Sequence, residues 1–214
     1  MKTKLVLVWL CTVLIYVLFL AWNGLFTSPL TEQEIEKYAE VSKDDYPEDA
    51  WEEMLSFLKE DDGKPVIMVN AIKLRDTPNA VNGKTFNSSE EALEDYSSFV
   101  TSYLIKRGSY PIFIGTSLIN SPEVWGLENA EEWTSVAMVR YKSRRVMIEM
   151  SSDPVFQKFH ESKVAAMEKT IAIPVSSNIH LVNLDLFVGL FLTVIGLFIS
   201  LFIIRKNTAA LEIE

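Results

Sequence analysis

Two long uncharged runs of apolar residues, one near each end, restrict what this chain can fold into. They extend from Leu5 to Trp22 and from Phe187 to Ile204, and each contains 18 residues. A helix of that length is about 27 Å long, close to the hydrocarbon thickness of a bilayer, about 30 Å. Because helices of soluble proteins usually keep a polar side, such runs indicate membrane spans. We therefore expect transmembrane helices at 5–22 and 185–204, with the lipid bilayer as a partner.

The first run has a second reading, as a cleaved signal peptide. Lys2 and Lys4 precede it, as in a signal sequence, but its apolar part exceeds the usual length of about 7–15 residues. No site of small residues follows it, and the residues before Cys11 are too bulky for a lipoprotein signal. An uncleaved anchor is the favoured interpretation.

Basic residues next to the two runs predict how the chain is oriented. Lys2 and Lys4 precede the first run, and Arg205 and Lys206 follow the second. Lysine and arginine beside a span stay on the cytoplasmic side. We expect both termini, including the tail at 205–214, to be cytoplasmic. The part between the spans would then be exported, to the periplasm or the cell exterior.

The exported part is acidic and lacks cysteine. All but four of the 20 Lys and Arg, and all but three of the 29 Asp and Glu, lie at 23–180, which gives a net charge of −10. Such a domain repels nucleic acids, so we expect no nucleic-acid partner. The single cysteine lies in the first run, so packing alone must hold the exported domain together.

Secondary-structure patterns divide the exported part at residue 62. Two short helices are expected at 23–62, one of them after the capping-box spacing of Thr31 and Glu34, and they form a stalk or cap. At 63–178, strand patterns alternate with helix patterns that start after Ser88 and Asp153, in the order β-α-β-β-α-β, and a further short helix is expected after Ser143. This order is typical of the ferredoxin-like, α+β fold. The four expected strands are at 65–74, 110–118, 134–141 and 170–176.

Prolines and apolar residues support this topology. In a sheet of order 4-1-3-2 the second and fourth strands are outermost, and Pro111 and Pro174 fall in them, where a missing N–H is tolerated. The first strand is apolar on both faces, and helices can cover only one of them. The other face needs a second cover, most simply a second copy of the same sheet, so we expect a homodimer.

From Pro65 to Val175 the chain resembles the family labelled domain of unknown function 1330, in the dimeric α+β barrel superfamily. The matching segments are PVIMVNAIKLRD and EEWTSVAMVRYKSRRVMIEMSSDPVFQKFHESKVAAMEKTIA. Lys142 stands where the family usually has proline, and Ala71-Ile72 replaces a Leu-Leu pair. The resemblance implies a homodimer whose sheets face each other, and it implies no reaction.

Four residues are candidates for a ligand site in the cleft where the sheet faces meet. Asn70 would orient a small molecule by hydrogen bonds, Arg140 would meet an anionic group, and Tyr141 would supply a hydroxyl. His160 would be the group that titrates near neutral pH. There are structural alternatives: Asn70 bonds a neighbouring loop, and His160 is a core or helix-surface histidine. If Asn70 and Arg140 are structural, replacing them would leave buried partners unpaired.

Two further patterns in the sequence each have two interpretations. Arg144 and Arg145 could receive an anion at a helix N-terminus or pair with nearby carboxylates. In the second span, four small residues share one helix face. One interpretation is a packing seam for another helix; the other is that small residues are simply common in membrane helices. They are Gly189, Thr193, Gly196 and Ser200.

The sequence favours a membrane-anchored, extracytoplasmic module that binds a small ligand or another protein. The alternative is a small enzyme of the oxygenase or isomerase kind that acts in the barrel cleft. No spacing typical of a metal site, a nucleotide loop or a catalytic nucleophile occurs. We therefore expect no metal and no cofactor, and we assign no catalytic residue.

Overall fold

The computed structural model describes residues 1–42, 48–81, 83–177 and 183–211. The chain forms two compact units. One comprises Met1–Phe26 with Asn178–Glu214, and the other comprises Thr27–Ser177.

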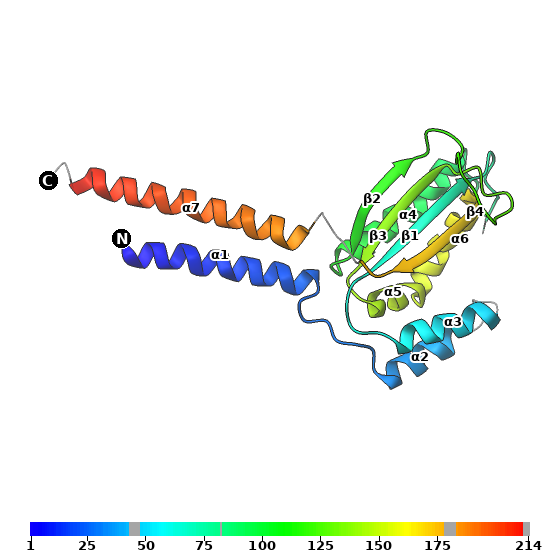
Figure 1. Ribbon diagram of the computed structural model, residues 1–214, viewed down its shortest axis with the longest axis horizontal. Helices are drawn as coiled ribbons and strands as arrows, with labels where there is room; N and C mark the ends of the chain where they lie inside the picture. The colour runs from blue at the N-terminus through cyan, green and yellow to red at the C-terminus, as the bar shows by residue number, and fades with distance from the viewer. Residues whose placement is uncertain (43–47, 82, 178–182, 212–214) are drawn as a thin grey trace. The chain divides into compact units, whose positions relative to one another are not determined.

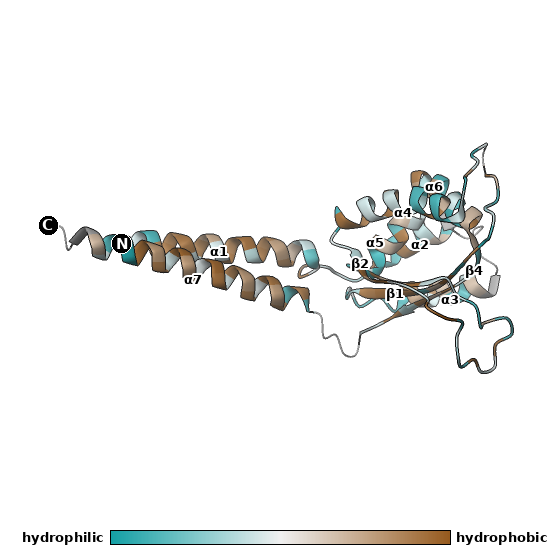
Figure 2. Ribbon diagram, turned by 90° about the horizontal axis from the view of Figure 1, so that it is seen from above, coloured by the Kyte–Doolittle hydropathy of each residue, from teal (hydrophilic) through white to brown (hydrophobic). Residues whose placement is uncertain are grey.

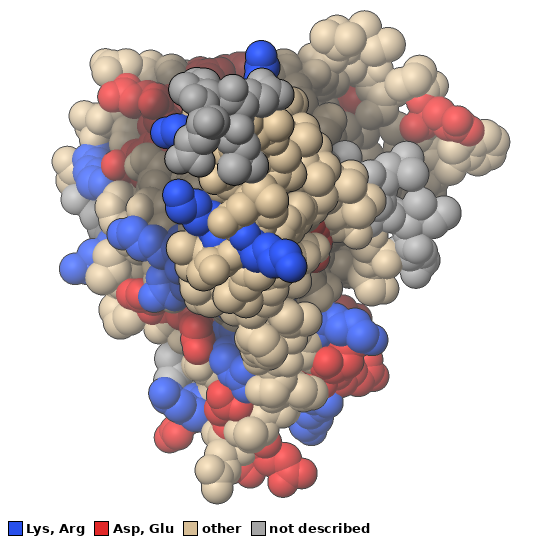
Figure 3. Space-filling view, turned by 90° about the vertical axis from the view of Figure 1, so that its left-hand side faces the viewer, with Lys and Arg blue, Asp and Glu red and all other residues tan. Residues whose placement is uncertain are grey.

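The first unit is a pair of long helices, α1 (Lys2–Asn23) and α7 (Leu184–Leu211). Both are long and apolar enough to cross a membrane, and Figure 2 shows them brown, hence hydrophobic, along most of their length. The start of α1 and the end of α7 lie at the same end of the pair (Figure 1), so the helices are antiparallel. Seen from that end, basic side chains stand out against an otherwise uncharged helix surface (Figure 3).

Glycines of α7 allow the two helices to approach closely. A Cβ at Gly196 would lie 3.3 Å from Thr12 Oγ1, and one at Gly189 would lie 3.0 Å from the Tyr16 ring. Two of the four residues of the predicted packing seam, Gly189 and Gly196, therefore face α1. Thr193 differs from them, because its side chain is exposed and donates a hydrogen bond to Gly189 O within its own helix.

Polar side chains join the helices at the other end of the pair. Asn23 Nδ2 donates to Asp185 Oδ1 at 2.6 Å, and Tyr16 Oη donates to the Asp185 carbonyl at 3.1 Å. These two hydrogen bonds join α1 to α7 and hold the helices in register at this end.

The second unit contains an antiparallel four-stranded sheet of order β2-β3-β1-β4. Its order and its helices confirm the predicted α+β, ferredoxin-like fold. Pro111 and Pro174 lie in the two edge strands, as predicted. The elements are β1 (Val66–Leu74), α4 (Ser89–Ile105), β2 (Tyr110–Thr116), β3 (Ser135–Tyr141), α5 (Arg144–Ser151), α6 (Pro154–Ala166) and β4 (Met167–Val175).

The helices begin at the capping residues that the sequence indicates. Ser88 Oγ accepts a hydrogen bond from the Glu91 amide, Ser143 from the Val146 amide, and Asp153 from the Val155 amide. Each side-chain oxygen satisfies an amide that has no partner inside its helix. Helices α4 and α6 then pack side by side against one face of the sheet (Figure 2).

The opposite face of the sheet is apolar and partly exposed. Phe113 and Ile173 each remain 51% exposed, and Val69 and Met138, which pair across β1 and β3, are half-buried between them. We call this the open sheet face. By the strand register its apolar residues are Ile67, Val69, Ala71, Phe113, Val136, Met138, Ile171, Ile173 and Val175, and Arg140 lies on the same face opposite Ile67.

Helices α2 (Glu32–Ser42) and α3 (Glu48–Lys59) belong to the same compact unit. Leu30, Ile35, Tyr38 and Leu58 form a buried cluster with Ile148 of α5. The segment predicted as a stalk or cap therefore packs on α5 in this unit.

The two arginines at the start of α5 are paired with carboxylates. Arg145 holds both oxygens of Glu34, at 2.9 and 3.0 Å, and also donates to the carbonyls of Ser28 and Pro29. Arg144 Nε lies 3.7 Å from Asp61 Oδ1. These contacts tie the cap to α5 and account for both arginines without a ligand.

Replacing Glu34 by glutamine should weaken this tie in a pH-dependent way. The hydrogen bonds from Arg145 lower the pKa of Glu34 from 4.5 to about 2. A lowered pKa in the folded state stabilises the protein above pH 4.5, and this contribution is lost as the pH falls towards 2. We expect Glu34→Gln to cost about 1 kcal/mol at pH 7 and less at pH 3, measured by urea unfolding.

The matched control is Glu36→Gln, which removes the same charge from an exposed position of the same helix. Equal losses in the two variants, or a loss from Glu34→Gln that does not change between pH 7 and pH 3, would contradict the ion-pair explanation.

Candidate functional site

A cavity of about 420 Å3 lies between the sheet and helices α4, α5 and α6. Ligand pockets in proteins commonly measure about 300–1,000 Å3. The cavity exists because short side chains face the helices in the middle of the sheet. Ala137 and Ala172 flank Asn70 on the neighbouring strands, and all three line the cavity.

Methionine is the most frequent residue type in the wall of the cavity. Five of the seven methionines of the chain line the cavity, and they come from α3, β1, α5 and β4. Methionine is unbranched, with three rotatable bonds and a polarizable sulfur, so a wall of this kind adapts to the shape of its contents. The five are Met54, Met68, Met147, Met150 and Met167.

Asn70 lies on the helix-facing side of β1 and lines the cavity. Its Nδ2 donates to the carbonyls of Met68 at 3.2 Å and Ala137 at 3.3 Å. The amide nitrogen is thus held by the backbone of two strands, which fixes the direction of the side chain at the cavity wall.

Two tyrosines line the cavity as neutral phenols. Tyr141 ends β3 and is 7% exposed, and burial raises its pKa above the ordinary value. Burial also raises the pKa of Tyr96, on α4, to about 12. Both hydroxyls therefore keep their protons at neutral pH.

His160 lies on α6 among aromatic rings. Its ring centroid is 5.5 Å from that of Phe156 and 6.3 Å from that of Tyr96. It lines the same cavity as Asn70 and Tyr141. The structure thus brings together three of the four residues that the sequence proposed, in a cavity within a single chain.

Arg140 lies elsewhere. Side chains alternate along a strand, so Arg140 and its neighbour Tyr141 are on opposite faces of the sheet. Arg140 is buried, donates to the Gly108 carbonyl at 3.2 Å and lies 5.3 Å from the centroid of the Tyr110 ring. It does not line the cavity.

Lys163 is the residue of this site that the sequence reasoning missed. It follows His160 by one helical turn, lines the cavity, and places Nζ 5.6 Å from the centroid of the Tyr96 ring. Burial lowers its pKa. A signal was present in the sequence: Phe156, His160 and Lys163 follow each other at spacings of four and three, which is one face of a helix.

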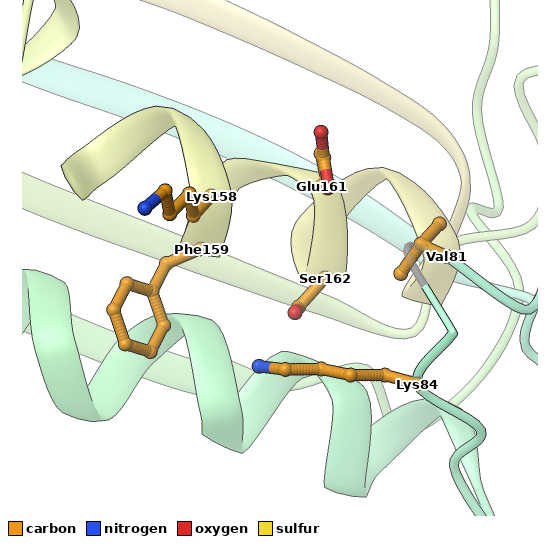
Figure 4. A pocket seen from close by; sticks show the side chains of 6 residues that line it. All are labelled: Val81, Lys84, Lys158, Phe159, Glu161 and Ser162. Carbon is orange, nitrogen blue, oxygen red and sulfur yellow. The ribbon is translucent and has the colours of Figure 1, made fainter. Parts of the chain in front are cut away.

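A second hollow, of about 400 Å3, lies on the outer side of α6 (Figure 4). Lys84 extends across it towards Phe159 and Ser162, and its Nζ pairs with Asp95 at 3.0 Å. Ser162 donates to the same carboxylate oxygen at 2.7 Å. Because the cation of Lys84 is already paired, this hollow is the weaker candidate. Within the described ranges, no group of three or more His, Cys, Asp or Glu could hold a metal ion.

Comparison with known proteins supports the fold and gives no activity. No protein-family model and no curated protein sequence matches the chain, so the family suggested by the sequence resemblance is not confirmed. Solved structures do match. A crystal structure of the methylated RPA0582 protein is 22% identical, with a TM-score of 0.50, and covers 62% of this chain and 93% of that one.

Two further matches are weaker. A second structure of RPA0582, a protein of unknown function from Rhodopseudomonas palustris, is 22% identical over 60% of this chain and 94% of that one, with a TM-score of 0.49. A dimeric protein of unknown function with a ferredoxin-like fold, from Bacteroides fragilis, is 14% identical over 53% and 96%, with a TM-score of 0.30. At these identities the likeness to RPA0582 concerns the fold alone.

Proposed function

We propose that this chain is a membrane-anchored module whose α+β unit binds a small, largely apolar molecule in the cavity between its sheet and helices. The observation that carries the proposal is the methionine-lined cavity, with Asn70, Tyr96 and His160 at its wall. A few polar groups in a mainly apolar wall are typical of sites that bind small molecules. The adaptable methionines favour an apolar ligand over a polar one, because a polar ligand would lose hydrogen bonds to water.

Filling the cavity should abolish binding. Ala137→Phe places a ring where the sheet is lined by short side chains, and it leaves the hydrogen bond from Asn70 to the Ala137 carbonyl in place. As a probe we choose phenylbutyramide, a neutral molecule with an apolar body. We expect saturable calorimetric binding to the full chain in lipid nanodiscs, and none to Ala137→Phe.

Val155→Phe, at an exposed position of α6, is the matched control and should bind like the parent chain. Empty nanodiscs give the background from lipid. Absence of saturable binding to the parent chain, or equal binding to Ala137→Phe, would refute the proposal.

The helix pair supports an expectation about the location of the unit. Antiparallel α1 and α7 place Lys2 and Lys4 at the same end as Arg205 and Lys206. The positive-inside tendency favours this end on the cytoplasmic side, and it supports an exported position for the α+β unit.

Cysteine labelling tests the topology. In a Cys11→Ser background, Leu118→Cys provides a thiol in a loop of the α+β unit, where Leu118 is 95% exposed, and Thr208→Cys provides one near the end of α7. We expect a membrane-impermeant maleimide to label Leu118→Cys in intact cells and Thr208→Cys only after permeabilisation. The reverse pattern would contradict the orientation.

The open sheet face supports a homodimer. Phe113, Ile171 and Ile173 are large apolar side chains exposed together on this face. A second copy would cover the same residues on both subunits, as in a two-fold interface.

A charge on this face should separate the subunits. We expect Ile173→Glu to halve the mass of the full chain in detergent micelles, measured by light scattering with correction for bound detergent. Burying an unpaired carboxylate in an apolar interface is strongly unfavourable. Leu118→Glu adds the same charge to an exposed loop and should leave the mass unchanged. A parent chain that is monomeric, or an Ile173→Glu chain that stays dimeric, would contradict this interface.

A further inference from the structure

We propose that the ligand of the cavity is an apolar monocarboxylate whose carboxylate group pairs with Lys163. This rests on the proposed ligand-binding function and adds the charge of the ligand to it. The observation behind it is a cation at the wall of an apolar cavity that the described part of the protein does not neutralise.

Helix α6 directs three side chains to the cavity. Phe156, His160 and Lys163 lie on the same face, and each lines the cavity wall. The Lys163 ammonium forms no ion pair or hydrogen bond with any residue that the structure describes. Its contact is the Tyr96 ring, whose centroid lies 5.6 Å from Nζ. An aromatic face attracts a cation but leaves its three donors unsatisfied.

A nearby lysine at the outer hollow, Lys84, is paired with a carboxylate. Lys84 reaches the space between α4 and α6 from the outer side and pairs there with Asp95. Asp95 also accepts a hydrogen bond from Ser162, so its carboxylate is already bound by two residues of the outer hollow. The cavity side of α6 carries the cation without a carboxylate.

An unpaired ammonium in such a site is costly, and a bound anion relieves that cost. Burial already favours the neutral amine, since it lowers the pKa of Lys163. A carboxylate would restore the charged form and form a charge-assisted hydrogen bond with it. The neutral phenol of Tyr96 can donate a second hydrogen bond.

The rest of the cavity defines the remainder of the ligand. Beyond the wall formed by Tyr96, His160 and Lys163, the lining is mainly methionine and aliphatic. One cation matches one negative charge. The fitting class is thus a single carboxylate on a flexible or aromatic hydrocarbon body, such as a medium-chain fatty acid or an arylalkanoic acid.

The test compares phenylbutyrate with its uncharged isostere phenylbutyramide on the full chain in lipid nanodiscs at pH 7. The two probes differ in the carboxylate alone. We expect the carboxylate to bind at least about tenfold more tightly, which corresponds to about 1.4 kcal/mol. Empty nanodiscs and zwitterionic lipids limit the contribution from partition into the bilayer.

Two variants on α6 test whether Lys163 causes the preference for the carboxylate probe. Lys163→Met should abolish it, so that both probes bind like the amide does to the parent chain. Lys158→Met removes the same charge from an exposed position and should retain it. The melting temperature separates ligand binding from a structural role. Loss of an unpaired cation from the cavity should leave the melting temperature unchanged or raise it. Loss of a structural lysine would lower the melting temperature.

Each outcome decides the proposal. Equal binding of both probes to the parent chain would overturn the carboxylate and leave the cavity as a site for neutral ligands. A preference that persists in Lys163→Met would overturn the role of Lys163. Absence of binding by either probe would overturn the ligand-binding function together with this inference.

Discussion

The alternation of side chains along β1 is the constraint on which the rest of the α+β unit depends. This strand is hydrogen-bonded on both sides, to β3 and β4, so its position in the sheet is fixed. One set of its side chains faces the helices and forms the cavity wall, and the other set forms the open sheet face. A shift of register by one residue would exchange the two sets. The cavity proposed for a ligand and the surface proposed for a second subunit are therefore two consequences of one strand.

Much of the fold could be predicted from the sequence because its signals are local. Prolines at 111 and 174 mark the strands that end the sheet, and Ser88, Ser143 and Asp153 mark helix starts through their own hydrogen bonds. The cavity could not be predicted in this way. It depends on Ala137 and Ala172 lying beside Asn70, and that requires the register of three strands separated by up to about one hundred residues of chain.

The candidate site was only partly accessible to sequence reasoning, for two physical reasons. Arg140 and Tyr141 are adjacent, and the period of a strand separates them onto opposite faces, which the alternation already implied. Lys163 was overlooked because a lysine is expected at the surface, although its spacing from Phe156 placed it on the buried side of α6. A charged residue at a core-facing position was the most informative exception in this helix.

The bond between Asn23 and Asp185 has a consequence for how the α+β unit unfolds. These residues lie just outside the two ends of the segment Thr27–Ser177. While α1 and α7 remain paired, the unfolded segment is a closed loop with less conformational entropy than a free chain. A covalent closure of a loop this long would contribute about 5 kcal/mol, which sets the upper limit for this reversible one. The helix pair thereby acts on the stability of a unit to which it does not belong, by holding the ends of that unit together.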